Sequence, residues 1–276
     1  LLALRATRQK RVPPARDDKV MADWNGLAIA ALAQAGFALG RDDWTEAAKS
    51  AFSFVQKYMM QKDKRLWHVW CKGKAQHAGL LDDYAHMIGA ALGLFETTGI
   101  VEYLTQAESW AEILQEDHAD KDKGGYFMSD WHENSLPLRP KSAHDGATPS
   151  GNGAMAHHLA RLYAITGKEA YRAAGMRTVA AFSGEAAHHL FPLATLMDAS
   201  DRLAHPAVLT AGKHLFETLQ DISWPALARA WGDGERAHLC IGQTCLAPVR
   251  QPQELKKMLL HERSNSARLA ANDGAR

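Results

Sequence analysis

The residues best suited to chemistry occur as three polar triplets, each directly before an apolar stretch of helical composition. Each triplet combines a carboxyl or hydroxyl group with an aromatic ring or an amide. Aromatic faces stack on the C–H surfaces of sugars, while carboxylates and amides hydrogen-bond to sugar hydroxyls. The triplets therefore predict a site for a small, sugar-like ligand, with helix capping as the alternative explanation for their acids and hydroxyls. They are Asp23-Trp24-Asn25, Asp82-Asp83-Tyr84 and Ser150-Gly151-Asn152.

The neighbouring carboxyls Asp82 and Asp83 are the first candidates for catalysis, because two nearby carboxylates can raise one pKa and produce a general acid. Adjacent residues of a helix do not face each other, so we expect one of the two to point inward and the other to cap the helix. A glycosidase also needs a second carboxyl on the other side of the scissile bond. Asp23 and Asp145 are the candidates for it, and the sequence does not choose between them.

The loop at residues 141–153 is the richest in polar groups, and its glycines allow the backbone to approach a ligand. From it we expect Asp145, Ser150 and Asn152 to bind the sugar, together with Trp24, Asn25 and Tyr84 listed above. An epimerase would need two bases on either side of a sugar carbon. His144 and His158 are the candidates, and we interpret most of the 14 histidines as structural.

Motifs for metals and cofactors are missing from the sequence, which has no HExxH and no pattern of two cysteines and two histidines. Four residues separate Cys240 from Cys245, unlike the CxxC of redox motifs, and the only other cysteine is Cys71. Phosphate loops, the dinucleotide glycine fingerprint and the nucleophile elbow are also missing. We therefore expect neither a metal nor a cofactor.

Apolar spacing of three to four residues predicts a mainly α protein. The predicted helices cover residues 26–39, 44–60, 84–97, 101–115, 153–166, 169–182 and 191–203, and two strand-like segments lie at 66–70 and 125–128. Three of the turns between them carry Gly40, Gly99 and Gly167, and each glycine is followed at +4 by an aromatic residue and at +8 by a small one. This repeat predicts αα-hairpins joined by long, variable loops, as in a helical toroid.

Four regions divide the chain. Residues 1–16 read as a helix end or linker, because Pro13-Pro14 stops a helix. Residues 17–205 form the αα-hairpin segment. Residues 206–261 predict a small α/β appendage with strands at 207–212 and 238–241 and helices at 214–219 and 252–260. The polar residues 262–276 predict a disordered tail.

The composition of the chain argues against some classes of partner and indicates where in the cell the protein is located. The 32 basic and 31 acidic residues give a formal charge of +1, which argues against a nucleic-acid binder and a polybasic membrane anchor. The longest apolar run, at residues 26–40, is shorter than the roughly 20 residues of a membrane span. The absence of an export signal and the few cysteines predict a cytoplasmic protein. The chain begins with Leu, so we expect a fragment or a processed form.

Five motifs resemble one known family. They are DDKVMADWNGL at 17–27, LDDYA at 81–85, GGYF at 124–127, DGAxPSGN at 145–152 and CxxxxCxxP at 240–248. In this order they are similar to the C-terminal part of thioredoxin-domain proteins of the YyaL and spermatogenesis-associated protein 20 type, over residues 5 to 260. The resemblance implies a thioredoxin-like domain followed by an (α/α)6 toroid of the six-hairpin glycosidase type, similar to N-acylglucosamine 2-epimerases and unsaturated glucuronyl hydrolases.

The resemblance also implies that this chain holds only the second half of the toroid and lacks the thioredoxin-like domain. A motif like HFEKMLYDN, which the family carries in its first hairpins, is absent. Two functions follow as hypotheses. The first is a carbohydrate-active module that hydrolyses or isomerises a sugar, with the acid or base at Asp82 or Asp83. The second is a non-catalytic helical module that binds a ligand or a protein and partners the thioredoxin-like domain. A truncated product without its own activity is the third reading.

Overall fold

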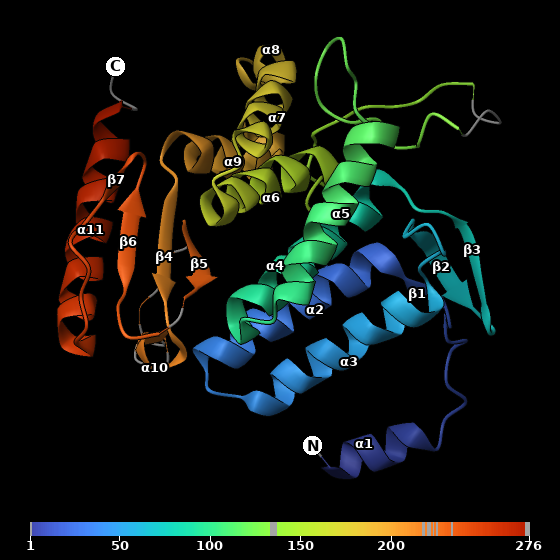
Figure 1. The fold of residues 1–276 in the computed structure, drawn as a ribbon. Coiled ribbons are helices and arrows are strands. Elements are labelled where there is room, and N and C mark those ends of the chain that lie inside the picture. The colour runs from blue at the N-terminus through green and yellow to red at the C-terminus, as the bar shows by residue number, and fades with distance from the viewer. Residues whose placement is uncertain are drawn as a thin grey trace.

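Helices dominate the computed structural model, which describes residues 2–132, 137–216, 219, 222, 224, 226–232 and 234–273, and for 266–273 the backbone alone. The first helix, α1 (Leu2–Gln9), buries none of its residues. Figure 1 shows it apart from the other helices at the N-terminal end of the chain. In the described part of the chain, no helix is long and apolar enough to cross a membrane.

Three αα-hairpins form the body of the molecule. Their first helices, α2, α4 and α6, lie side by side, and α9 continues this inner row beyond α6. The second helices, α3, α5 and α7, pack on the outside (Figure 1). The bounds are α2 (Ala22–Ala38), α3 (Asp42–Tyr58), α4 (Leu81–Thr98), α5 (Val101–Asp117), α6 (Gly151–Thr166), α7 (Glu169–Ala181), α8 (Ser183–Ala186), a 3₁₀ turn η1 (Phe191–Leu193) and α9 (Ala194–Ala204).

The turns of the three hairpins confirm the predicted repeat. Gly40, Gly99 and Gly167 have φ angles of 61°, 74° and 69°, a left-handed conformation that L side chains rarely adopt. The small residues that follow them, Ala48, Ala107 and Gly175, are buried where the outer helices touch their neighbours. The architecture is therefore a partial (α/α)6 toroid built of αα-hairpins.

Burial is most complete on α4, which has α2 on one side, α6 on the other and α5 outside. Nearly all its residues from Leu81 to Glu96 are buried, whereas α2 and α3 bury a single face each. A helix covered all round needs apolar or small residues on every face, and the sequence of α4 supplies them. The main core therefore runs along α4.

A small antiparallel sheet precedes α4. It consists of β1 (Val20–Met21), β2 (Trp67–Cys71) and β3 (Lys74–Ala78), in that order. The sequence predicted β2 and missed the other two. It also predicted a strand at 125–128, where the structure has a single bridge between Ala119 and Tyr126. That segment is wrapped into turns by two left-handed glycines, Gly124 and Gly125.

The C-terminal appendage, residues 207–273, is a four-stranded sheet of order β5-β4-β6-β7 with a covering helix. Strands β4 and β5 are parallel, and the other pairs are antiparallel. Leu209, Leu239, Leu255 and Leu259 share its core. The bounds are β4 (Ala207–Ala211), α10 (Lys213–Phe216), β5 (Leu227–Trp231), β6 (His238–Ile241), β7 (Thr244–Cys245) and α11 (Pro252–Asp273).

The starts of three helices and the predicted tail differ from the sequence-based expectation. Helices α2, α4 and α6 begin two to four residues early, so Asp23, Asp82 and Asp83 lie within first turns instead of before them. The predicted disordered tail is helical from Glu262 to Asp273, because α11 continues without a breaking residue past its buried leucines. Residues 274–276 of that tail, and 217–218 of the helix predicted at 214–219, lie outside the described residues.

Candidate functional site

Asp83 connects the first turns of two inner helices. Its carboxylate accepts hydrogen bonds from the backbone N–H of Leu80, at 2.8 Å, and of Asp23, at 3.1 Å. Nδ1 of His68, on β2, lies 2.8 Å from Oδ2. The side chain is fully buried. Asp83 therefore caps α4 and ties it to α2 and β2, the role expected for one of the two neighbouring carboxyls.

His68 completes this buried contact as the positive partner. The hydrogen bond to Asp83 raises the pKa of His68, and burial opposes that rise. The contact therefore favours the charged forms of both groups, while burial opposes this by raising the pKa of Asp83. The pair leaves Asp83 without a free oxygen lone pair directed at a ligand, because backbone and imidazole donors surround it.

Asp82 is the carboxyl that stays available. It lies in the first turn of α4 beside Gly151, and its Oδ1 is buried without a hydrogen-bond partner. Burial raises the pKa of Asp82 to about 6, and the negative charges of Asp83 and Asp23 add to the rise. A carboxyl that keeps its proton to pH 6 can act as a general acid near neutrality.

Asp23 and Trp24 lie in the first turn of α2, next to Asp82. The backbone N–H of Asp23 is held by Asp83, and Oδ1 of Asp23 accepts the N–H of Trp24 at 2.7 Å. The Trp24 side chain is 61% exposed. The exposed indole offers an apolar stacking face, and the Asp23 carboxylate offers hydroxyl-binding oxygens, both from the first turn of α2.

His86 stands one helical turn below Asp82 on the same face of α4. It lines a cavity of about 450 Å³ between α2, α4, α6 and α9. The ring is buried, and Nε2 has no hydrogen-bond partner. Burial lowers the pKa of His86, so the ring is neutral near pH 7. Two unpartnered buried polar atoms therefore lie one turn apart on α4, and the one on His86 belongs to a residue that lines the cavity.

Two further groups act on the pKa of His86. The negative charge of Asp23 and a hydrogen bond to the backbone of Pro149 raise this pKa and oppose the effect of burial. A neutral imidazole carries one lone pair, so His86 can serve as a base.

His158, on α6, lines the same cavity. Its Nδ1 lies 3.3 Å from Nη1 of Arg161, which can only donate. Burial holds the pKa of His158 well below its ordinary value, so the neutral ring carries its proton on Nε2. Arg161 itself is held by Glu96, with Nη2 at 3.0 Å from Oε1. The cavity therefore contains one imidazole acceptor and one imidazole donor.

Glycines allow the inner helices to approach closely around this site. A Cβ on Gly26 would meet the His86 backbone at 2.6 Å, and one on Gly89 would meet Nε2 of His158 at 2.6 Å. A Cβ on Gly151 would collide with Oδ1 of Asp82. These glycines bring Asp82, His86 and His158 next to the backbones of neighbouring helices.

Several residues that the sequence predicted to bind a sugar make structural hydrogen bonds instead. Asn152 is fully buried, accepts the N–H of Tyr126 and donates to the carbonyls of Tyr126 and Ser142. Asp145 accepts the N–H groups of Ser150 and Thr195, at 2.9 and 2.8 Å. Both residues fix the loop before α6, so their polar groups are occupied.

Ser150, Asn25 and His144 also have other partners. Ser150 is the N-cap of α6, accepts the N–H of Gly153 and donates to the Ala143 carbonyl. Asn25 donates to the carbonyl of Met21 one turn earlier. His144 pairs with Glu185 through Nε2, 2.5 Å from Oε1, and does not line the cavity of His86.

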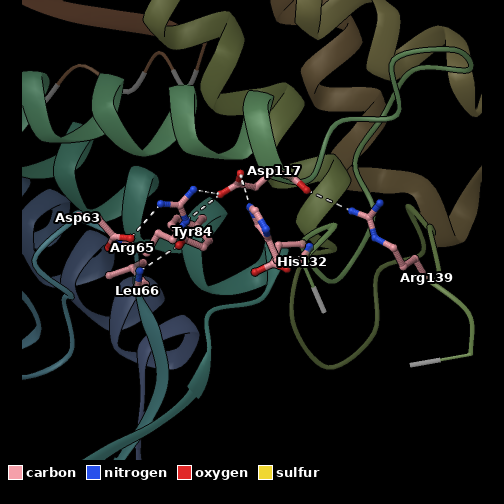
Figure 2. A network of polar contacts seen from close by, with 8 residues as sticks. Asp63, Arg65, Leu66, Tyr84, Asp117, His132 and Arg139 are labelled. Atoms are coloured by element: carbon pink, nitrogen blue, oxygen red, sulfur yellow. Dashed lines mark hydrogen bonds and ion pairs between the residues drawn. The ribbon is translucent and has the colours of Figure 1, made fainter. Parts of the chain in front are cut away.

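Tyr84 is buried beside a polar network (Figure 2). Its hydroxyl accepts the N–H of Leu66 at 2.9 Å, and its side chain is only 2% exposed. Next to it, Asp117 receives Nε and Nη2 of Arg65 at 2.9 and 2.7 Å, and its carbonyl accepts Nη2 of Arg139. In this position Tyr84 supports the loops around the site and offers no surface to a ligand.

The sequence reasoning missed His68 and His86. A signal for His86 was present, since it lies four residues after Asp82 and therefore on the same helical face. His68 had no such signal, because its partner Asp83 is brought to it by the pairing of β2 with β1. No group of three or more residues able to hold a metal ion occurs among the residues that the structure describes.

Comparisons with known sequences show clear relatives. Spermatogenesis-associated protein 20 from Homo sapiens is 27% identical over 297 residues, which cover 91% of this chain and 37% of that protein. Its Mus musculus counterpart is 33% identical over 174 residues, covering 58% and 22%. The chain thus spans well under half the length of these relatives. No protein-family model matches. These homologues confirm the resemblance drawn from the five motifs.

Comparisons with solved structures show the fold. A GH76 alpha-mannanase from Bacteroides thetaiotaomicron has a TM-score of 0.55 at 16% identity, covering 70% of this chain and 53% of that one. A sugar epimerase from a ruminal bacterium has a TM-score of 0.54 at 15% identity, covering 76% and 63%. Cellobiose 2-epimerase from Spirochaeta thermophila has 0.51 at 19%, covering 60% and 43%. At this identity the likeness establishes the six-hairpin toroid fold alone.

Proposed function

We propose that this chain binds a sugar between α2, α4 and α6 and that Asp82 and His86 exchange protons with it. One observation carries the proposal. Asp82 and His86 lie one turn apart on α4, each has a buried polar atom without a partner, and His86 lines the cavity. Buried polar groups are normally paired, so a hydroxylated ligand is the partner that they lack.

The roles follow from the protonation of each group. Asp82, with a pKa of about 6, donates a proton to a sugar oxygen. Nε2 of His86 accepts a proton from a carbon next to the carbonyl of an open-chain sugar. Trp24 stacks on the sugar ring at the open end of the site, and Asp23 accepts hydroxyl hydrogen bonds there.

Isomerisation or epimerisation is the reaction that this arrangement supports best. It needs a base and a donor in an enclosed site, and His86 and His158 provide an imidazole lone pair and an imidazole N–H in one cavity. Hydrolysis by the two neighbouring carboxyls would need Asp83, whose oxygens already accept hydrogen bonds from three donors. The epimerases among the structural neighbours are consistent with this choice.

Glycoside hydrolysis is the second candidate, favoured by the raised pKa of Asp82 and the presence of Asp23 on the facing helix. The two reactions give different products from the same protein. Cellobiose and mannose incubated in D₂O would gain deuterium at C2 under isomerisation. Nitrophenyl glycosides would release nitrophenol under hydrolysis.

The test uses the variants Asp82→Asn and His86→Gln, with the exposed Asp122→Asn and His189→Gln as matched controls. We expect the two site variants to lose at least 100-fold in turnover and the two controls to keep it. Sugar binding without turnover in the wild type would favour the non-catalytic module instead. Unchanged turnover in both site variants would contradict the proposal.

The wider setting is also a proposal. A thioredoxin-like domain in the full-length protein, a cytoplasmic location and the division at residues 16, 205 and 261 rest on the sequence. The relatives extend well beyond the matched part, which supports testing function on a longer chain as well. Activity in the longer chain alone would mean that segments outside these 276 residues complete the site.

A further inference from the structure

Cys240 and Cys245 form a disulfide on the edge of the C-terminal sheet. They lie directly opposite each other on β6 and β7, and β7 is the last strand of the sheet. Cys245 is exposed and Cys240 is half-buried. Residues of a strand alternate between faces, so Cys240 points away from the core that holds its neighbour Leu239.

The hairpin is held closed without this bond. Ile241 pairs with Thr244 at the turn, and the N–H of Leu246 donates to the Leu239 carbonyl at 2.9 Å. Further along, Ala237 and Val249 exchange two backbone hydrogen bonds of 2.8 and 3.0 Å. A disulfide stabilises a fold mainly by closing a long loop of the unfolded chain, and this one closes a loop of five-residue separation.

Exposure and a minor structural role are the features of a disulfide that exchanges with thiols. We propose that Cys240 and Cys245 are a reversible redox couple, reduced by a dithiol, and that this chemistry is separate from the sugar site. Buried disulfides that hold a fold together resist such attack, because the sulfur cannot be reached by the incoming thiolate.

The exchange has two steps. A thiolate of the dithiol attacks Sγ of the exposed Cys245, the Cys240–Cys245 bond breaks, and Cys240 leaves as a thiolate that takes up a proton. The second thiol, after losing its proton, attacks the mixed disulfide and releases Cys245, which is protonated in turn. The chain gains two electrons and two protons, and the dithiol is oxidised to a disulfide.

Thiol labelling of the folded chain provides the first test. A Cys71→Ser variant removes the third cysteine and leaves the pair. We expect no labelling as purified, two labelled cysteines after brief treatment with dithiothreitol in native buffer, and reversal by oxidised glutathione. Circular dichroism should stay unchanged throughout. Reduction that requires denaturant, or two free thiols that oxidised glutathione does not join, would overturn the proposal.

Trapping identifies the sulfur that is attacked. A CxxC-containing protein whose second cysteine is replaced by Ser stops after the first step, and mass spectrometry of the adduct should place it on Cys245. Reduction by dithiothreitol without a protein adduct would mean that only small dithiols reduce the pair. A protein adduct on Cys245 would establish exchange with a protein. No reduction by dithiothreitol and no protein adduct on either cysteine would contradict the exchange.

A structural role makes a different prediction. The double variant Cys240→Ser with Cys245→Ser should fold with a melting temperature lowered by less than about 5 °C, since the closed loop is short. Loss of the folded state in this variant would mean that the disulfide is a structural crosslink. The variant Cys71→Ser, with the disulfide intact, is the matched control.

Discussion

Asp82 and Asp83 are adjacent in sequence and differ in every physical respect that matters for chemistry. Asp83 is surrounded by N–H donors from Leu80, Asp23 and His68, whereas Asp82 keeps an unpartnered oxygen and a raised pKa. The difference comes from direction alone, since successive residues of a helix point about 100° apart. One carboxylate therefore caps the helix, and the other keeps an oxygen without a partner.

Asp82→Asn should stabilise the protein at high pH. The pKa of Asp82 is raised from 3.8 to about 6, so the folded state holds its proton more tightly and a buried negative charge opposes folding above pH 6. Removing that charge should raise the free energy of unfolding by about 1 to 2 kcal/mol at pH 8 after allowance for partial exposure. The gain should vanish as the pH falls through 6 towards 4.

Urea unfolding of both proteins between pH 4 and pH 8 measures this difference. Asp122→Asn, at an exposed acid, should show no such pH-dependent gain. Equal stability of wild type and Asp82→Asn at all pH values would mean that Asp82 is well solvated, which removes the basis for its role as an acid.

His68→Gln should destabilise the protein, and more so at low pH. The pKa of His68 is raised by its hydrogen bond to Asp83, so the ion pair contributes fully below the ordinary pKa of 6.5 and is lost as the pH rises through the raised value. We expect a loss of about 2 kcal/mol at pH 6 and less at pH 9. Thermal unfolding at both pH values checks this, with the exposed His77→Gln as control.

At the scale of elements, the inner helices depend on glycines at their contacts. Gly151 is the first residue of α6 and lies next to Asp82. A side chain at this position would occupy the space of the Asp82 carboxyl and of Leu81. Helices α4 and α6 approach each other at these residues. The space in which the Asp82 side chain can rotate therefore depends on Gly151, which belongs to another hairpin. The packing of α6 on α4 thus determines the position of the Asp82 carboxyl.

Gly151→Ala should lower stability by about 1 to 3 kcal/mol, because the added methyl group overpacks the contact with α4. It should also reduce the turnover proposed for Asp82, since that carboxyl must move. Gly184→Ala is the matched control, because nothing lies within 4 Å of a Cβ there. Denaturation curves and sugar turnover of the two variants test this prediction. Equal values for both variants would contradict it and would show that α6 accommodates the methyl group without loss of stability.

For the molecule as a whole, the C-terminal appendage is fastened to the hairpins by polar and aromatic contacts. Trp231, on β5, donates from Nε1 to the Glu96 carbonyl at 3.3 Å and packs on the Gly99 turn. Arg229 lies over the Phe37 ring at 4.1 Å, with Nε 3.9 Å from Oε2 of Glu96. These contacts reach the C-terminal ends of α2 and α4, whereas Asp82 lies in the first turn of α4.

Trp231→Ala should therefore weaken the attachment. We expect a loss of about 2 to 3 kcal/mol, from lost burial and a lost hydrogen bond, and a separate early transition of the appendage. Circular dichroism during urea unfolding measures both effects. Trp131→Ala, at a tryptophan that is 57% exposed, should change stability by less than about 0.5 kcal/mol. A single unaltered transition in both variants would contradict this coupling.

Local pattern alone determined much of this protein. Apolar periodicity predicts the helices, and the glycine-centred turns at 40, 99 and 167 predict the hairpins, because both depend only on neighbours in the chain. The motifs predict the relatives that were found. The pairing of one capping carboxyl with one free carboxyl at Asp82-Asp83 also follows from helix geometry.

Only the tertiary structure decided which polar residues remain free. Tyr84, Asp145 and Asn152 looked suited to a sugar, yet each bonds to backbone groups brought in from distant segments. His86 and His68 gained importance for the same reason, through Pro149 and Asp83. A side chain is available to a ligand only when the fold leaves its polar atoms unpaired, and that depends on long-range contacts that local sequence does not encode.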